Sequence, residues 1–168
     1  LTILGQRHKD VKNNLSLNPG LKNMLNIATK PAWAYEMATT QYKTFGNIVG
    51  HAKGVDDLSS LMTWSAEMVD PSLDWADIEW IRKEWDGPII LKGIMDTEDA
   101  KIAADMGIET AIVSNHGGRQ LDGADSSIRW MPKIADAVGD RMELIMDSGV
   151  RTGMDIYRAK AMGASGVL

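Results

Sequence analysis

The stretch VSNHGGRQLDG, residues 113–123, places a histidine, two glycines and an arginine directly after a short apolar run. Residues 109–114 are predicted to form a buried strand, because they are mostly apolar and do not alternate with polar residues. Loops at the carboxyl ends of parallel strands are where such folds build their active sites. We therefore expect His116 and Arg119 to belong to a site at the end of this strand.

Strands and helices alternate along the chain on both sides of this stretch. The expected strands cover 89–93, 109–114, 143–147 and 165–168, and the expected helices cover 73–85, 97–106, 126–138 and 152–162. The first helix is expected to begin at residues 70–72 and the second at residues 97–99. This order predicts parallel βα units and a sheet that is covered on both faces.

The polar residues at the strand ends decide between the two architectures built from such units. Lys92, the 114–119 cluster and Asp147 each follow a different strand, and these strands are successive. Convergence from several strand ends is typical of a barrel, whereas a doubly wound sheet binds its ligand at one switch point. Four strands are half of a barrel, and a full barrel typically needs about 250 residues. The sequence is predicted to be the C-terminal half of a (β/α)8 TIM barrel, cut from a longer protein.

Composition excludes several classes of function. The 168 residues carry a net charge of −5 and no stripe of basic residues with interleaved aromatics, which argues against nucleic-acid binding. The absence of cysteine excludes disulfides and thiolate metal sites. His8 and His51 have no neighbouring ligand set, so no metal is expected.

The residue types at the strand ends suggest a chemistry. His116 as base and Arg119 as a fork for a carboxylate suit the removal of a proton from a small hydroxy acid. The alternative is a turn histidine beside a surface arginine. Lys92 either extends to solvent or faces a negative partner. The turn MDSGVRTG, residues 146–153, suits a phosphate, with Arg151 as its charge partner.

Taken together, IILKG, SNHGGRQLD and MDSGVRTGMD resemble the FMN-dependent α-hydroxy acid dehydrogenase/oxidase family. The opening LGQRHKD resembles the segment that follows the fourth barrel strand of that family, so the resemblance covers the whole chain. Within the family, the loop FGNIVGHAKG and the run at 70–94 resemble the membrane-associated L-lactate dehydrogenases that feed a respiratory chain.

The resemblance implies a role for each matching residue. His116 is expected to be the active-site base, Arg119 to bind the substrate carboxylate, and Arg7 to assist at the substrate. Lys92 is expected near the N1/O2 edge of the flavin, where it would stabilise the anionic reduced form. The remaining cofactor contacts are expected from Ser114 at the ring and from Asp147, Ser148, Gly149 and Arg151 at the ribityl-phosphate end.

The chain also departs from the family pattern. The aspartate that pairs with the catalytic histidine is expected just before Leu1, and a Gly-Arg pair of the phosphate site just after Leu168. The tyrosine and other flavin contacts of strands one to four are not in the chain. Ser148 stands where many relatives have glycine.

These features predict oxidation of an L-2-hydroxy acid, foremost L-lactate to pyruvate, with FMN as cofactor and a quinone or cytochrome as electron acceptor. An oxidase that reduces oxygen is the alternative for the enzyme, and an inactive half barrel is the alternative for the isolated chain. The resemblance implies a homotetramer on the cytoplasmic side of the bacterial inner membrane.

Residues 1–168 are expected to form one partial domain, with βα units of strands five to eight in 71–168. The segment 13–70, with helical patterns at 21–29, 31–40 and 55–68, is expected to be an insertion after strand four. Two roles remain open for it, contact with a membrane or packing against the barrel or another subunit. The membrane contact would come from Trp33, Met37, Tyr42, Phe45, Ile48 and Val49.

Overall fold

A computed structural model describes residues 20–41, 46, 48, 51, 54, 60, 64, 70, 72–121 and 123–168. The chain divides into two compact units, Leu1–His8 with Pro71–Leu168, and Lys9–Asp70.

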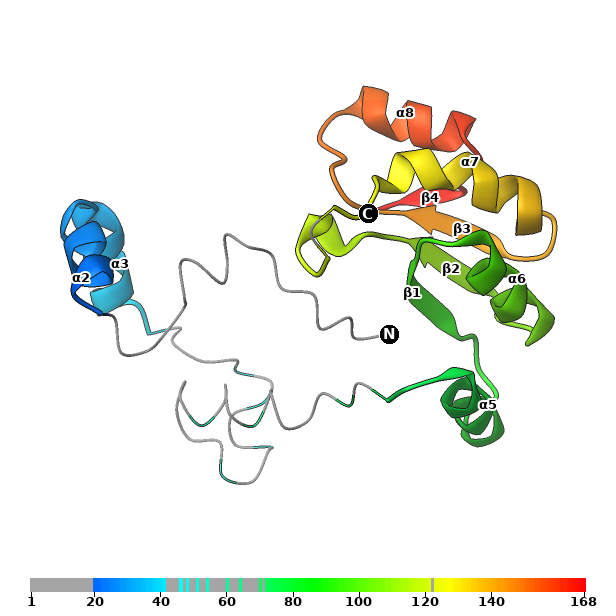
Figure 1. Ribbon diagram of the computed structural model, residues 1–168, viewed down its shortest axis with the longest axis horizontal. Helices are drawn as coiled ribbons and strands as arrows, with labels where there is room; N and C mark the ends of the chain where they lie inside the picture. Colours follow the sequence, from blue (N-terminus) through cyan, green and yellow to red (C-terminus); the bar gives the residue numbers. More distant parts are fainter. Residues whose placement is uncertain are drawn as a thin grey trace. The chain divides into compact units, whose positions relative to one another are not determined.

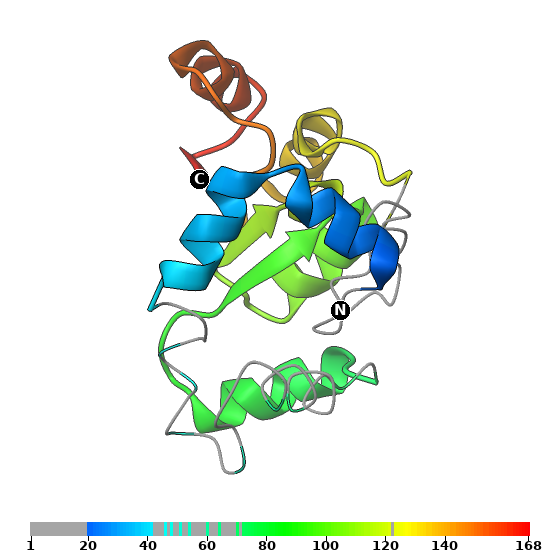
Figure 2. The same ribbon diagram turned by 90° about the vertical axis from the view of Figure 1, so that its left-hand side faces the viewer.

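The larger unit is built around a parallel sheet of four strands (Figure 1). These are β1 (Ile90–Ile94), β2 (Thr110–Val113), β3 (Glu143–Met146) and β4 (Gly166–Val167). The strands lie in the order β1-β2-β3-β4, which is also their order in the sequence. A doubly wound sheet reverses its strand order at a switch point, and this sheet does not, so its winding is that of a barrel. Figure 2 shows β1 and β2 running side by side in the same direction.

One face of the sheet is covered by helices. The helices of this unit are α5 (Trp75–Glu84), α6 (Thr97–Asp105), α7 (Ser127–Val138) and α8 (Gly153–Ala161). Alternate strand residues form a buried core with small and aliphatic side chains of α6, α7 and α8; its members include Ala111, Val113, Leu144, Met146, Ala100, Ala103, Ile134 and Ala159. Alanines on α6 allow this helix to lie close to the sheet.

The opposite face of the sheet is not covered by any described helix of this unit. Lys92, Ile112, Ile145 and Gly166 lie opposite one another across the four strands and share this face. Ile112 and Ile145 are half-buried, and Lys92 is exposed. In a closed barrel this face lines the interior, so the expectation of a sheet with two covered faces holds for only one face of the described unit.

One expected helix start, one expected helix cap and one expected strand are corrected. Helix α5 begins at Trp75 with Asp74 as its N-cap, not at residues 70–72, because Asp74 and Asp77 form a reciprocal capping box. Helix α6 begins at Thr97 as expected, but it is capped by Asp96, whose side chain accepts from the Glu98 N–H. Strand β1 is an edge strand rather than a buried one, and its Ile90 is 55% exposed.

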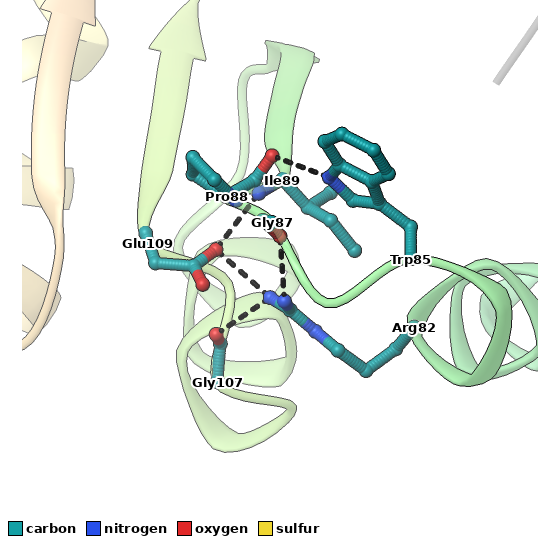
Figure 3. A network of polar contacts seen from close by, with 7 residues as sticks. All are labelled: Arg82, Trp85, Gly87, Pro88, Ile89, Gly107 and Glu109. Carbon is teal, nitrogen blue, oxygen red and sulfur yellow. Dashed lines mark hydrogen bonds and ion pairs between the residues drawn. The ribbon is translucent and has the colours of Figure 1, made fainter.

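The amino ends of β1 and β2 are joined by a polar network (Figure 3). The Arg82 guanidinium donates to the Glu109 carboxylate at 2.8 Å and to the carbonyls of Gly87 and Gly107. The same carboxylate accepts from the Ile89 N–H at 2.9 Å. The hydrogen bonds from Arg82 and from the Ile89 backbone lower the pKa of Glu109 to about 2. This network fixes where β1 and β2 begin, at the end of the sheet remote from the polar strand ends.

The smaller unit contains the helices α2 (Leu21–Ala28) and α3 (Pro31–Thr39), which pack against each other (Figure 1). Neither helix has a buried residue. The pattern expected at 55–68 falls largely outside the described residues, as do Tyr42, Phe45 and Val49. None of the helices in the described part of the chain is long and apolar enough to cross a membrane.

Candidate active site

Lys92 lies where β1 is interrupted by a bulge. The register with β2 shifts between Lys92 and Ile94, and Gly93 in between has a φ of 97°, which L side chains rarely adopt. The Lys92 ammonium lies 2.8 Å from the Asp147 carboxylate and donates to the Ser114 hydroxyl at 2.8 Å. Of the two alternatives for Lys92, the structure shows the negative partner.

Ser114 is the buried centre of the site. Its oxygen accepts from Lys92 and, at 3.1 Å, from the backbone N–H of His116. One hydroxyl at the end of β2 therefore connects the end of β1 with the loop that carries the histidine. These two contacts use both lone pairs of the hydroxyl oxygen.

Asp147 remains ionised although it is largely buried. Burial raises the pKa of its carboxyl. Hydrogen bonds from Lys92, Ser114 and Ser148, with the Lys92 charge, outweigh that effect, so this pKa lies below its usual value. Lys92 and Asp147 thus form a charged pair at the strand ends.

The histidine lies in a tight turn, η1 (His116–Gly118). His116, Gly117 and Gly118 all have positive φ, at 56°, 67° and 67°. The Asn115 side chain stabilises the turn. It accepts from the Gly118 N–H at 3.2 Å and donates to the Asp125 carbonyl at 3.1 Å. A non-glycine residue such as His116 adopts this conformation when its surroundings require it.

The two side chains expected to meet the substrate are free to do so. His116 and Arg119 are exposed. Neither the imidazole nor the guanidinium has a hydrogen bond or ion pair with any described residue. The loop therefore presents a base and a cation whose polar groups are not used by the described part of the chain.

The turn after β3 presents unpaired backbone donors. Ser148 and Gly149 have positive φ, at 75° and 84°. Within the described part of the chain, the N–H groups of Ser148, Gly149 and Val150 have no acceptor. Gly149 has open space where a side chain would be. Consecutive N–H groups in such a turn form a concave site for an anion.

Arg151 and the start of α8 complete this end of the site. The Thr152 and Asp155 side chains form a capping box, which also accepts from the Arg151 N–H. The Arg151 guanidinium is exposed and makes no ion pair with the described residues. The N–H groups of Arg151, Thr152 and Asp155 are thus satisfied by the capping box, whereas those of 148–150 have no acceptor among the described residues.

The structure brings most of the predicted site residues to one end of the sheet. Lys92, Ser114 and Asp147 are in direct contact, and the turns of His116–Gly118 and Asp147–Gly149 are linked by a hydrogen bond from the Gly117 N–H to the Ser148 hydroxyl at 3.0 Å. Arg7 lies outside the described residues. The roles of all the predicted site residues toward substrate and cofactor stay predictions.

Sequence reasoning missed two structural contributors to the site, Gly93 and Asn115, and one contact of the predicted residue Ser148. A glycine inside a strand pattern is a signal for a bulge, so Gly93 was identifiable from IILKG. Asn115 before two glycines is a signal for a side chain that caps a turn. No local signal shows that Ser148 contacts Gly117, because 31 residues separate them.

The sequence of this chain is similar to those of known proteins along its whole length. A family model described as FMN-dependent dehydrogenase matches residues 1–168. The chain belongs to the FMN-dependent dehydrogenase family. An L-lactate dehydrogenase of Caulobacter vibrioides is 45% identical over 173 aligned residues, which cover 100% of this chain and 44% of that protein.

Two solved structures of similar proteins support the fold. A monotopic membrane protein, (S)-mandelate dehydrogenase, matches 100% of this chain and 44% of its own with a TM-score of 0.84 and 29% identity. A mandelate oxidase with (S)-4-hydroxymandelic acid matches 66% of this chain and 31% of its own with a TM-score of 0.61 and 42% identity. The predicted fold class, part of a TIM barrel, is confirmed. The chain spans somewhat less than half the length of the relatives it matches.

The strand-end residues fit the cofactor after which the family is named. The N–H groups of 148–150 and the Arg151 guanidinium, which have no partner among the described residues, suit its phosphate. The Lys92 ammonium suits a ring edge that becomes negative on reduction. Open space beside Gly93 and Gly149 allows a ligand to approach the backbone at both points.

Proposed function

We propose that the protein containing this chain oxidises an L-2-hydroxy acid, foremost L-lactate, to the 2-oxo acid with FMN as cofactor. The observation that carries this proposal is the loop of 116–119 beside the Lys92–Ser114–Asp147 cluster, which presents a base and a cation whose side chains contact no polar group of the described residues. The relatives named L-lactate dehydrogenase support the choice of substrate.

Each residue has a task that follows from its chemistry. The Arg119 guanidinium binds the substrate carboxylate with two parallel hydrogen bonds and thereby orients the hydroxyl-bearing carbon. The His116 imidazole accepts a proton from the substrate. FMN supplies an acceptor for two electrons. Lys92, held in place by Asp147, provides a positive charge where negative charge appears on the cofactor.

Two acceptors for the electrons are distinguished by experiment. We propose a respiratory quinone or cytochrome, in keeping with the L-lactate dehydrogenase relatives. The mandelate oxidases among the similar structures favour oxygen as the second candidate. Aerobic turnover of the parent protein with L-lactate separates the two. Consumption of oxygen with release of peroxide at the turnover rate supports an oxidase, and turnover that requires an added quinone or cytochrome supports the dehydrogenase.

The smaller unit adds a proposal about location. Leu21, Met24 and Leu25 lie on one face of α2 and are 76%, 57% and 64% exposed, and Trp33 and Met37 on α3 are also exposed. The similar (S)-mandelate dehydrogenase is a monotopic membrane protein. We propose that this unit attaches the parent protein peripherally to the cytoplasmic side of the inner membrane, in contrast to packing against the barrel or another subunit.

The test of the proposed reaction is anaerobic mixing of L-lactate with the FMN-loaded parent protein, followed by flavin absorbance. We expect loss of the oxidised flavin band in the parent, and reduction about 100- to 10,000-fold slower in His116→Ala. Flavin content is measured in both proteins, so that loss of the base is separated from loss of the cofactor. Failure of the parent to bind FMN contradicts the proposal, whereas bound but unreduced FMN points to another hydroxy acid.

A further inference from the structure

The backbone at Ser148 has a conformation that its side chain does not favour. Its φ of 75° lies in the left-handed region, which glycine adopts freely and which is uncommon for other residues. Nothing in the turn requires a side chain for packing, because Ser148 is only half-buried. A strained non-glycine residue beside an active site indicates that the side chain has a function there.

The contacts of the Ser148 hydroxyl suggest that function. The hydroxyl donates to the Asp147 carboxylate at 2.8 Å and accepts from the Gly117 N–H at 3.0 Å. It therefore connects the turn after β3 with the turn that carries His116. With the hydroxyl engaged on both sides, Ser148 is left with one free lone pair and no free proton for a ligand.

This link closes a ring of polar contacts around the histidine. On one side, the His116 N–H donates to Ser114, which accepts from Lys92. On the other side, the Gly117 N–H donates to Ser148, which donates to Asp147, and Asp147 pairs with Lys92. Two successive N–H groups of the turn are thus held by two hydroxyls, and both hydroxyls are anchored on the same charged pair.

We propose that Ser148 is a positioning residue for the catalytic base. Its hydroxyl holds the His116–Gly118 turn in its left-handed conformation and fixes the imidazole relative to the Lys92–Asp147 pair. The side chain contacts neither substrate nor the reacting atoms, and it acts through the Gly117 backbone. This proposal rests on the proposed oxidation, for which His116 is the base.

Two substitutions separate the hydroxyl from the backbone strain. Ser148→Gly removes the hydroxyl and relieves the backbone strain. Ser148→Ala also removes the hydroxyl but keeps the backbone strain. We expect both variants of the FMN-loaded parent protein to reduce flavin about 10- to 100-fold more slowly at saturating L-lactate, because a small displacement of a catalytic group has effects of that size. The KM for L-lactate and the Kd for FMN should stay within about twofold, since Arg119 and the phosphate turn do not depend on the hydroxyl.

The control is Ser165→Ala, which removes another hydroxyl of the same unit. The Ser165 hydroxyl donates to the Leu144 carbonyl at 2.8 Å, toward the other end of the sheet. This variant should lower thermal stability and leave the rate of flavin reduction within about twofold of the parent. Hydrogen exchange gives a second readout that does not need turnover. Amide hydrogens of the peptide containing 115–119 should exchange faster in both Ser148 variants than in the parent. In Ser165→Ala their exchange should be unchanged.

The outcomes are distinct from one another. The proposal is overturned if Ser148→Gly has the parental rate of flavin reduction and the parental hydrogen exchange at 115–119. The hydroxyl would then contribute neither to the rate nor to the stability of the turn. A weaker FMN affinity with an unchanged reduction rate also overturns it, and assigns Ser148 to the cofactor instead. If the parent itself does not reduce bound FMN with any hydroxy acid, the proposed function fails. Hydrogen exchange still tests the hydroxyl link in that case, and unchanged exchange at 115–119 in the Ser148 variants contradicts it.

Discussion

At the scale of single residues, two lysines of similar exposure form ion pairs with carboxylates of very different exposure. The Lys92 side chain is 45% exposed and pairs with Asp147, which is 16% exposed; the Lys101 side chain is 47% exposed and pairs with Glu98, which is 73% exposed. Loss of a cation beside a sheltered carboxylate leaves a charge that water cannot fully solvate. We expect Lys92→Met to lower the free energy of unfolding by about 1–2 kcal/mol and Lys101→Met by less than about 0.5 kcal/mol.

The same pair predicts a dependence on pH. Asp147 has a lowered pKa when folded, so its contribution to stability is present above its usual value of 3.8 and is lost as the pH falls below it. Lys92→Met removes one cause of that lowered pKa. The stability difference between the parent and Lys92→Met should therefore be constant near neutral pH and shrink below about pH 4 in chemical denaturation. Equal losses for the two lysine variants at pH 7 would contradict this account.

At the scale of elements, the starts of β1 and β2 depend on the Arg82–Glu109 network. Glu109→Gln removes the charge that draws the Arg82 guanidinium and the Ile89 N–H together. The folded pKa of about 2 lies below the usual 4.5, so the contribution of this carboxylate is complete above about pH 5 and is lost between 4.5 and 2. We expect a lower Tm for Glu109→Gln at pH 7, and a gap to the parent that closes as the pH falls through this window.

The matched control for that prediction is Glu98→Gln on α6. Glu98 also forms an ion pair, with Lys101 at 2.7 Å, but this pair joins residues of one helix and its carboxylate is 73% exposed. Its substitution should change the Tm little at any pH. Flavin reduction should persist in both variants, because the described contacts of both carboxylates are made with residues outside the candidate site. A Tm gap for Glu109→Gln that does not change with pH would contradict the electrostatic origin.

Individual elements also show which structural features could be predicted from the sequence and which could not. The strand of Thr110–Val113 and the turn after it were predicted from a local pattern, because apolar residues without alternation and a pair of glycines each have a local physical cause. The start of α5 and the cap residue of α6 were less accurate, since several acidic or hydroxyl residues near 70–74 and 96–99 compete as caps. The contacts of Lys92 with Asp147 and of Ser148 with Gly117 depend on strand order and register, which no local pattern encodes.

At the scale of the whole molecule, both units expose a methionine and a tryptophan to a similar degree, so the two pairs can be compared. Met24 on α2 and Trp33 on α3 are 57% and 49% exposed, and Met154 on α8 and Trp80 on α5 are 57% and 61% exposed. The double variants Met24→Gln/Trp33→Gln and Met154→Gln/Trp80→Gln remove the same side-chain types at similar exposure. Only the first pair lies in the unit proposed to contact the membrane.

Peripheral attachment by short helices scales with the apolar area that they insert, at about 25 cal/mol per Å². The loss of a methionine and a tryptophan from α2 and α3 should therefore release the parent protein from membranes, with more than half of it in the supernatant after sedimentation with vesicles. The variant of Met154 and Trp80 should sediment as the parent does. Both double variants are measured for flavin reduction with L-lactate, so that release is separated from unfolding. If the first variant stays with the vesicles and instead changes the oligomeric state in solution, α2 and α3 pack against another subunit and the membrane proposal is wrong.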